Sequence, residues 1–546
     1  MKKRFAMTVA AILAAVTGAM ACTNLIVGKA ASADGSVIVS YSADSYGMYG
    51  YLCHYPAAVH AKGTWREVLD WETGRYTGRI PEAEQTYNVI GNINEYQVTI
   101  AETTFGGREE LVNPEGIIDY GSLIYIALQR SKTAREAIDV MTSLVEEYGY
   151  NSGGESFSVA DPNEVWIMEM IGKGPGRKGA VWVAVRIPDD CIAAHANQAR
   201  IRQFPLKDKN NCLYSKDVIK FAREMGYFDG KDQDFDFAEA YCPADFSGLR
   251  YCDARVWSYF NMFADADMSQ YLPWAMGDVT ASPMPLYIKP KQKVSVRDVQ
   301  NAMRDHYEGT PMDITQDLGA GPWSMPYRPS PLSFKVDDKT YFNERPISTQ
   351  QTAFTFVSQM RSELPNAIGG VLWFGTDDAN MAVFTPVYCC TNVVPECYKR
   401  EMADAVTFSE KSAFWLFNMV SNMVYPRYSA LIGDLKKVQK DAEDTFAQNQ
   451  AAVEAKAMEL YNDNPPKAVA MLTKYTGETA MSTMAAWGNL AKYLIVKHND
   501  MVVKPEENGE FKRIETGEGA APVRPGYPEH FNRRVVKETG ERYLMK

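Results

Sequence analysis

The stretch "GAMACTNLIVG", residues 18–28, places a cysteine directly after the tripeptide Ala19-Met20-Ala21. This small-x-small tripeptide has the form of a signal-peptidase cleavage site. Cleavage after Ala21 would make Cys22 the first residue of the mature chain, with a free α-amine. The apolar run that follows is typical of a buried strand. The sequence therefore predicts a mature protein that begins with a cysteine and enters a strand at once.

The residues before Cys22 have the pattern of an export signal. Lys2, Lys3 and Arg4 give a positively charged start, and residues 6–16 are mostly apolar but too few to span a bilayer. No later apolar run approaches the roughly 18 residues of a membrane helix, so no transmembrane segment is expected. We predict a signal peptide over residues 1–21 and a mature chain in the periplasm or outside the cell.

The composition is that of a globular, acidic protein. Hydrophobic residues make up 46% and charged residues 23% of the 546 residues, which is ample for a packed core. The net charge is −11, and loss of the three cations of the leader makes it −14. Because the sequence has no basic stripe or run of Lys and Arg, nucleic acid is not an expected partner.

Cysteine usage raises the question of disulfide bonds. The cysteines are Cys22, Cys53, Cys191, Cys212, Cys242, Cys252, Cys389, Cys390 and Cys397. An exported protein meets oxidising conditions. The eight that remain beside Cys22 are consistent with some disulfides and one free working thiol. A set of buried thiols without disulfides is the alternative.

The order of predicted elements favours an α+β fold. "NLIVG" and "GSVIVSY" predict one β-hairpin, and "EVWIMEMI" and "AVWVAVRI" predict another. From residue 408 the pattern becomes helical. Because strands and helices do not alternate regularly, a doubly wound parallel sheet is not favoured. We predict a catalytic domain over 22–407, a helical region over 408–500 and a tail over 501–546.

Several common sites are absent from the sequence or discounted. It contains no HExxH, no zinc-like Cys/His spacing and no GxSxG. Residues 174–179, "GPGRKG", fit GxGxxG but lie between two predicted strands, whereas a dinucleotide-binding loop must open a helix. We interpret them as a hairpin turn. Ser295 and Asp298 predict a helix capping box, and His195 and His306 are interpreted as structural.

An N-terminal cysteine can supply both a nucleophile and a base. A thiol with a pKa of about 8.5 is mostly protonated at neutral pH. An α-amine with a pKa of about 7.7–8.0 is partly neutral there and can take the thiol proton. Cys22 would then act without a histidine, as N-terminal threonine enzymes do. This chemistry requires no cofactor and no metal ion.

Two other interpretations of Cys22 stay open. Lipoproteins also begin with cysteine after cleavage, which would make the chain a non-catalytic surface lipoprotein. Their leaders usually carry Leu three positions before the cysteine, where this chain has Ala19, and a polar tether is missing here. Alternatively, cleavage elsewhere would leave Cys22 as a packed or disulfide-bonded residue.

Longer blocks of the sequence resemble one known family. In order, they are "CTNLIVGKAASADGSVIVSYSAD", "INEYQVTIAET", "DPNEVWIMEMIGKG", "AVWVAVRIPDDCIAAHANQARI", "RYCDARVWSYFN", "SVRDVQNAMRDHYEGTPMD", "VLWFGTDDANMAVFTPVY" and "SAFWLFNMVSN". Together they resemble the PepD-type secreted dipeptidases, cysteine peptidases of the N-terminal nucleophile (Ntn) hydrolase superfamily. The resemblance implies an αββα sandwich with the nucleophile at the start of a central strand. It also implies hydrolysis of dipeptides with broad specificity.

The resemblance carries over to four site residues. Cys22 matches the nucleophile, and Asp44 in "SYSAD" matches an aspartate that orients the nucleophile in the related choloylglycine and penicillin V acylases. Those acylases have Arg three positions earlier, where this chain has Tyr41. Asn197 in "HANQAR" is similar to the oxyanion-hole asparagine, and Arg255 in "DARVW" is similar to a second site arginine.

Each of the last three residues also has a structural interpretation. Asp44 could be a turn residue, Asn197 could begin a helix over "QARIRQF", and Arg255 could be an ion-pair partner. The function predicted from the sequence is that of a secreted cysteine-type exopeptidase that cleaves dipeptides through a thioester. The alternatives are an amidase of the penicillin V acylase or bile-salt hydrolase type and the surface lipoprotein.

Overall fold

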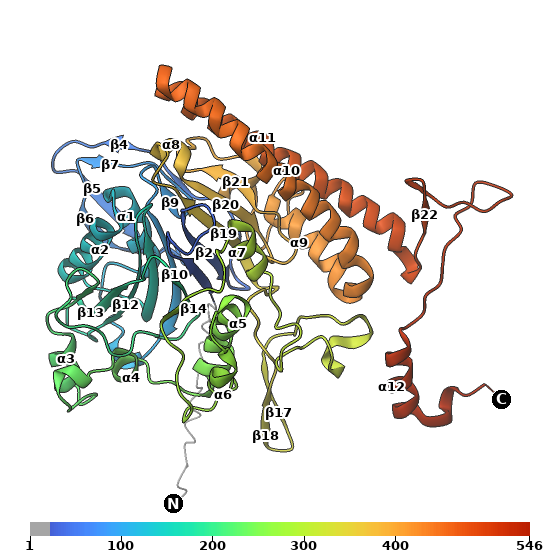
Figure 1. Ribbon diagram of the computed structural model, residues 1–546, viewed down its shortest axis with the longest axis horizontal. Coiled ribbons are helices and arrows are strands. Elements are labelled where there is room, and N and C mark those ends of the chain that lie inside the picture. The colour runs from blue at the N-terminus through green and yellow to red at the C-terminus, as the bar shows by residue number, and fades with distance from the viewer. Residues whose placement is uncertain (1–21, 546) are drawn as a thin grey trace, which may run out of the picture.

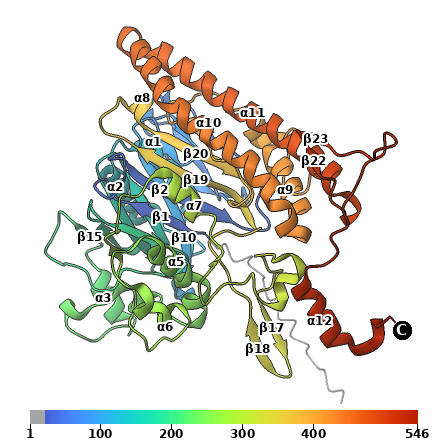
Figure 2. The ribbon, with the colours of Figure 1, turned by 45° about the vertical axis from the view of Figure 1, so that its right-hand side comes forward.

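The computed structural model describes residues 22–545, so the predicted signal peptide, 1–21, lies outside the described part. Two large antiparallel sheets lie face to face, and helices cover their outer faces (Figures 1 and 2). Strands and helices are mixed without a parallel βαβ repeat. The predicted α+β class is confirmed.

The first sheet contains the strand that follows Cys22. Its strands, in spatial order, are β16 (Tyr287–Ile288), β14 (Ile192–His195), β1 (Asn24–Val27), β2 (Val37–Asp44), β19 (Thr352–Met360), β20 (Val371–Thr376) and β21 (Thr385–Tyr388). β1 and β2 form the predicted hairpin, with Ile26 opposite Val39. β1 is a central strand, since β14 pairs with its other edge.

The second sheet faces the first. Its strands, in spatial order, are β15 (Cys212–Tyr214), β13 (Ala180–Arg186), β12 (Val165–Gly172), β11 (Gly154–Ala160), β10 (Thr99–Gly106), β9 (Ile93–Asn94), β8 (Val89–Ile90) and β3 (His54–Tyr55). β12 and β13 form the second predicted hairpin. Gly174 and Gly176 in its turn have φ angles of +87° and +72°, which favour glycine. The GxGxxG stretch is therefore a turn, as predicted.

The core fills both the space between the sheets and the space beneath the helices. β10 alternates polar and apolar residues, a pattern typical of a half-buried strand. Most of its residues are nevertheless buried on both faces, including Glu102. One face packs toward the first sheet, and the other toward α1 (Tyr120–Arg130) and α2 (Ala134–Tyr148). β10 is therefore buried on both faces because helices cover the face that would otherwise meet solvent.

Helices also cover the outer face of the first sheet. They are α5 (Ala254–Phe263), α7 (Val296–Ala302), α9 (Ala413–Val424), α10 (Tyr428–Asp463) and α11 (Pro465–His498). The predicted capping box of Ser295 and Asp298 begins α7. α10 and α11 run side by side along this face (Figure 1). None of the helices within residues 22–545 is both long and apolar enough to cross a membrane.

Shorter elements complete the described chain. They are α3 (Val218–Glu224), α4 (Phe237–Tyr241), α6 (Leu272–Ala275), α8 (Asn366–Gly369), α12 (Glu529–Thr539) and the strand pairs β4 (Ala58–Val59) with β7 (Gln85–Thr86), β5 (Trp65–Leu69) with β6 (Tyr76–Pro81), β17 (Ser333–Val336) with β18 (Lys339–Phe342), and β22 (Glu506–Glu507) with β23 (Glu510–Phe511). The tail that carries α12 extends away from the main body (Figure 1).

The cysteines and the surface charge bear on two sequence-based expectations. All nine cysteines lie in the described part, and each is a free thiol, so the expectation of some disulfides is wrong. Many are buried in the core as single thiols; Cys389 Sγ, for example, donates to the carbonyl oxygen of Asn366 at 3.0 Å.

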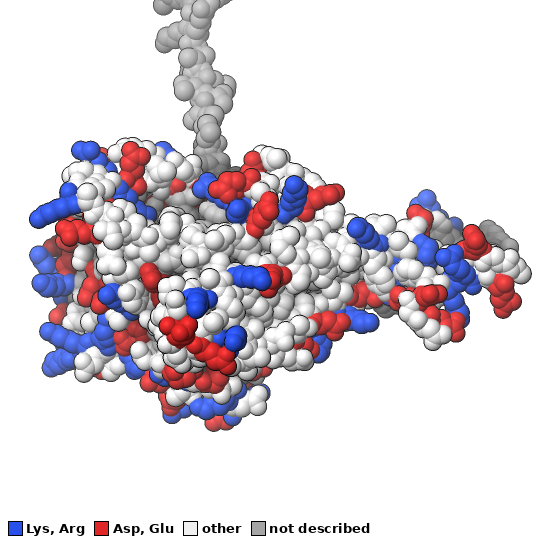
Figure 3. All heavy atoms as spheres, turned by 90° about the horizontal axis from the view of Figure 1, so that it is seen from above, with Lys and Arg blue, Asp and Glu red and all other residues white. Residues whose placement is uncertain are grey.

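On the face shown in Figure 3, Lys and Arg lie interspersed with Asp and Glu. That face has no continuous basic stripe.

Candidate active site

Cys22 lies immediately before β1, and its side chain is fully buried. Its Sγ lies 3.6 Å from Tyr41 Oη of β2 and 3.4 Å from Glu102 Oε1 of β10. Tyr41 also donates to Glu102 Oε1 at 2.5 Å. The two sheets therefore each bring a polar group to the thiol.

This environment keeps the thiol protonated. Burial is the main reason that the pKa of Cys22 lies well above its usual value, and the negative charges of Glu102 and Asp44 raise it further. Hydrogen bonds from the Asp44 backbone and from Tyr41 lower the pKa by less. Cys22 is therefore no preformed thiolate and needs a base when it reacts.

Arg255 lies in the first turn of α5 and fixes the backbone of Cys22. Its guanidinium donates to the carbonyl oxygen of Cys22 at 2.5 Å and to Asn197 Oδ1 at 3.0 Å. Burial, together with the positive charge of Arg345, lowers the pKa of Arg255 to about 10. The structure thus brings three of the four predicted site residues together. These two acceptors of Arg255 are neutral oxygens and not carboxylates, so the hydrogen bonds do not form an ion pair.

Asn197 follows β14 in a left-handed backbone conformation, with φ of +64°. Its Nδ2 donates to the carbonyl oxygen of Thr104 at 2.7 Å. Residues 198–204 are not helical, so the interpretation of Asn197 as a helix start is wrong. The side chain instead links the end of β10 to the arginine that holds Cys22.

Asp44 is the last residue of β2 and is fully buried. It accepts hydrogen bonds from Arg345 at 2.5 Å, Thr352 Oγ1 at 2.7 Å and Ser42 Oγ at 3.0 Å. Its pairing and burial exclude an exposed turn role. Arg345 is 301 residues away in sequence and was not identified from the sequence, although it places an arginine near the site.

Glu102 and Glu155 were also missed by sequence reasoning. They lie on the same face of neighbouring strands, β10 and β11, and both are at most 1% exposed. Burial and the negative charge of Glu102 raise the pKa of Glu155 well above its usual range. Hydrogen bonds from Glu155, Tyr41 and Cys22 oppose the effect of burial on Glu102. Burial still raises the pKa of Glu102 on balance, but less than that of Glu155, so the proton is held more firmly on Glu155.

His195 does not act as a base in this arrangement. Its Nδ1 lies 2.7 Å from Thr103 Oγ1, and its Nε2 lies 2.8 Å from Ser158 Oγ. Burial, and then the positive charge of Arg200, lower its pKa to about 3. The imidazole is neutral and ties the two sheets together, in agreement with the structural interpretation.

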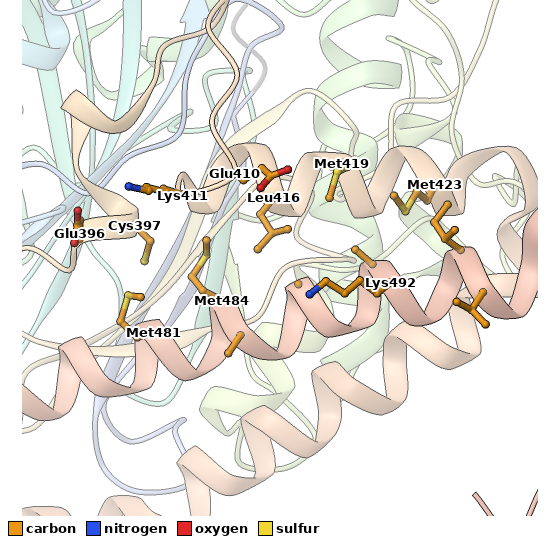
Figure 4. A pocket seen from close by; sticks show the side chains of 15 residues that line it. Glu396, Cys397, Glu410, Lys411, Leu416, Met419, Met423, Met481, Met484 and Lys492 are labelled. Atoms are coloured by element: carbon orange, nitrogen blue, oxygen red, sulfur yellow. The ribbon is translucent and has the colours of Figure 1, made fainter. Parts of the chain in front are cut away.

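Larger pockets lie elsewhere on the described part of the chain. A cavity of about 900 Å³ between α9 and α11 is lined largely by methionines and other apolar side chains (Figure 4). Its one thiol, Cys397, has a pKa raised by burial to about 12. A small cavity of about 10 Å³ instead adjoins the Cys22 site through Tyr41. Size alone therefore does not locate the reactive centre.

Comparison with known proteins gives a consistent result. The chain matches Peptidase family C69 over residues 21–51 and 48–441. It is 27% identical over 495 residues to a probable dipeptidase of Latilactobacillus sakei, covering 87% of this chain and 95% of that protein. It is 30% identical over 392 residues to a probable dipeptidase of Salmonella dublin, covering 68% and 81%. It is 24% identical over 453 residues to dipeptidase A of Lactobacillus helveticus, covering 79% and 86%.

Proposed function

The chain belongs to Peptidase family C69 and is a cysteine-type dipeptidase, and we propose that it works outside the cytoplasm with Cys22 as an N-terminal nucleophile. One observation carries the proposal: a buried, protonated thiol stands directly before a central strand, with its backbone held by Arg255. The two facing sheets with outer helices support an Ntn-hydrolase αββα sandwich. Cleavage after Ala21 by signal peptidase would expose the α-amine.

The α-amine of Cys22 is the proposed general base. The neutral amine takes the Sγ proton as the sulfur attacks the carbonyl carbon of the first residue, forming a C–S bond and an oxyanion. The resulting α-ammonium returns the proton to the leaving nitrogen as the C–N bond breaks. Water, deprotonated by the same amine, then attacks the thioester carbonyl carbon. The C–S bond breaks, the ammonium returns its proton to Sγ, and the first amino acid is released.

The neighbouring residues have positioning and electrostatic roles in this scheme. Asn197 supplies a side-chain N–H to the oxyanion, together with a backbone N–H. Arg255 fixes the Cys22 carbonyl and orients the Asn197 amide through Oδ1. Asp44, held by Arg345, fixes the end of β2 beside the thiol.

The domain organisation follows from the same proposal. Residues 22–407 form the catalytic domain, the helical region 408–500 packs on it, and 501–546 form the tail. The helical region would limit substrates to dipeptides. Deletion of that region should then permit cleavage of longer peptides, and a deletion variant that stays folded and still cleaves only dipeptides would count against this role.

The decisive test of the proposed chemistry compares the parent with Cys22→Ser and Cys22→Ala. Both variants should lose hydrolysis of dipeptides while keeping the parent's unfolding transition. A parallel panel of conjugated bile salts and penicillin V separates a dipeptidase from an amidase, because the proposal expects turnover of the dipeptides alone. Variants that cleave dipeptides as fast as the parent would reject Cys22 as the nucleophile.

A further inference from the structure

Acidic side chains gather beside the thiol without a cationic partner. Glu102 contacts Cys22 Sγ, and Glu155 lies next to Glu102. No Lys, Arg or His within residues 22–545 forms a salt bridge with either carboxyl group, whereas Asp44, the other acid near the thiol, is paired with Arg345. A buried negative charge without a counter-ion is costly. The site is therefore electrostatically complementary to a positively charged ligand group.

Unpaired acceptor atoms are present at the same place. Glu102 Oε2 is buried, and within the described residues it has no donor apart from the proton that Glu155 holds. Asn24 Oδ1 is likewise buried without a donor, and its Nδ2 donates to the Glu102 carbonyl oxygen at 2.7 Å. A group that donates several hydrogen bonds could satisfy both atoms, and an ammonium group has three N–H bonds.

We propose that Glu102 binds the α-ammonium group of the substrate's first residue and thereby selects peptides with a free amino terminus. This inference rests on the proposed function of Cys22 and deepens it. The ammonium nitrogen of a peptide is two covalent bonds, of about 1.5 Å each, from the carbonyl carbon that Sγ attacks. Glu102 Oε1 lies 3.4 Å from Sγ. A carboxylate this close to the sulfur can reach the ammonium group when the carbonyl carbon is bonded to that sulfur.

A small cavity beside Tyr41, which donates a hydrogen bond to Glu102, suits such a group. The cavity of about 10 Å³ has the size of one water molecule, and the rings of Tyr41, Trp71, Tyr120 and Phe354 line it. Aromatic faces attract cations. Burial, followed by the charges of Glu102 and Glu72, raises the pKa of Tyr120 well above its usual value, so these carboxyl groups lie close to the cavity.

The same arrangement predicts that the enzyme rejects blocked amides. A penicillin or a conjugated bile salt presents an acyl group that has no ammonium in this position. Binding such a substrate would leave the Glu102 charge buried and uncompensated. Sites that are built to bond a polar group discriminate strongly against analogues that lack it.

The test compares alanyl-alanine with propionyl-alanine, which differs only by loss of the ammonium group. Both substrates are measured with the parent, Glu102→Gln and Glu155→Gln. The parent should prefer alanyl-alanine by about 100-fold or more in kcat/KM, and Glu102→Gln should reduce this preference to less than about 10-fold. Glu155→Gln should keep the preference within about threefold, because an amide replaces a carboxyl that is already neutral.

Two results would overturn the proposal. The first is a parent enzyme that cleaves both substrates equally well, and this measurement needs no variant to fold. The second is a Glu102→Gln enzyme that slows on both substrates with the preference intact, because Glu102 would then serve the thiol or its base. Neither result touches the nucleophile, which is tested separately by the loss of alanyl-alanine hydrolysis in Cys22→Ala.

Discussion

Buried carboxylates in two regions of this molecule differ in whether an arginine is paired with them. In α10, Glu454 makes two hydrogen bonds, at 2.6 and 2.8 Å, to the guanidinium of Arg361. Glu443 on the same helix lies between Arg297 and Arg304. Beside Cys22, Glu102 and Glu155 face each other and no described cation forms a salt bridge with them.

The carboxylates of α10 hold this helix against the first sheet, whereas those beside Cys22 are available to bind a ligand. Arginines neutralise the acids where α10 packs on the first sheet, so the charges there are complete without any other molecule. At the thiol, burial raises the pKa of both carboxyl groups, and that of Glu155 is raised further than that of Glu102. Groups with strongly perturbed pKa values in a site are candidates for function. The imbalance therefore marks the Cys22 region as the working part of the protein.

The largest expected effect is on catalysis at Cys22. Replacement of Cys22 by Ala should lower kcat/KM for alanyl-alanine by about 10⁴-fold or more, as loss of a nucleophile does in other hydrolases. The steady-state rate is the measurement, with denaturant unfolding as the control for folding. A Cys22→Ala variant that keeps more than about one hundredth of the parent rate would contradict the comparison, because the Cys22 region would then have no catalytic role that α10 lacks.

The second effect is on stability in α10. Glu454→Gln should leave the buried Arg361 uncompensated and lower the free energy of unfolding by about 3–5 kcal/mol, with kcat/KM unchanged. Glu459→Gln is the matched control, because Glu459 forms an exposed pair with Lys456 on the same helix and such pairs contribute little. Equal unfolding curves for the two variants would show that the buried pair stabilises the fold no more than the exposed pair does.

Asn197 tests the oxyanion role. Asn197→Ala should reduce kcat by about 100- to 1,000-fold, equivalent to about 2.7–4 kcal/mol of transition-state stabilisation. KM for alanyl-alanine should change little, since the oxyanion forms only in the transition state. A variant with an unchanged kcat would leave Asn197 as a purely structural link between Thr104 and Arg255.

The smallest effect concerns the proton on Glu155. Its pKa is raised in the folded protein by burial and by Glu102, so its contribution to stability is complete below the pKa of the unfolded chain, about 4.3. That contribution is lost as pH rises toward the folded pKa. Glu155→Gln lacks this titration, so its unfolding free energy relative to the parent should increase from pH 5 to pH 8. A difference that is constant with pH would mean that Glu155 is ionised in the folded state.

Short sequence patterns predicted those elements of the fold that neighbouring residues form among themselves. The hairpin of β1 and β2 and the capping box of α7 follow from short stretches, and both are present. Cys22 was predicted from the cleavage site before it, and Asn197 and Arg255 through a family resemblance. The structure brings the three together although 233 residues separate Cys22 from Arg255.

Other site residues left no usable signal in the sequence. Glu102 occupies a polar position in an alternating strand, which usually faces water; here helices cover that face. Arg345 pairs with Asp44 across 301 residues, and no motif connects them. Such residues become recognisable only when the sheets and helices that bury them are assembled.

The central claim, that Cys22 acts as the first residue of the chain, is tested most directly on the exported active protein. Intact mass and N-terminal sequencing should be measured on the same sample that hydrolyses dipeptides. The account predicts a chain that begins with Cys22 and carries an unmodified α-amine. A fully active enzyme in which Cys22 is internal or acylated would contradict it, because the amine could not then act as the base.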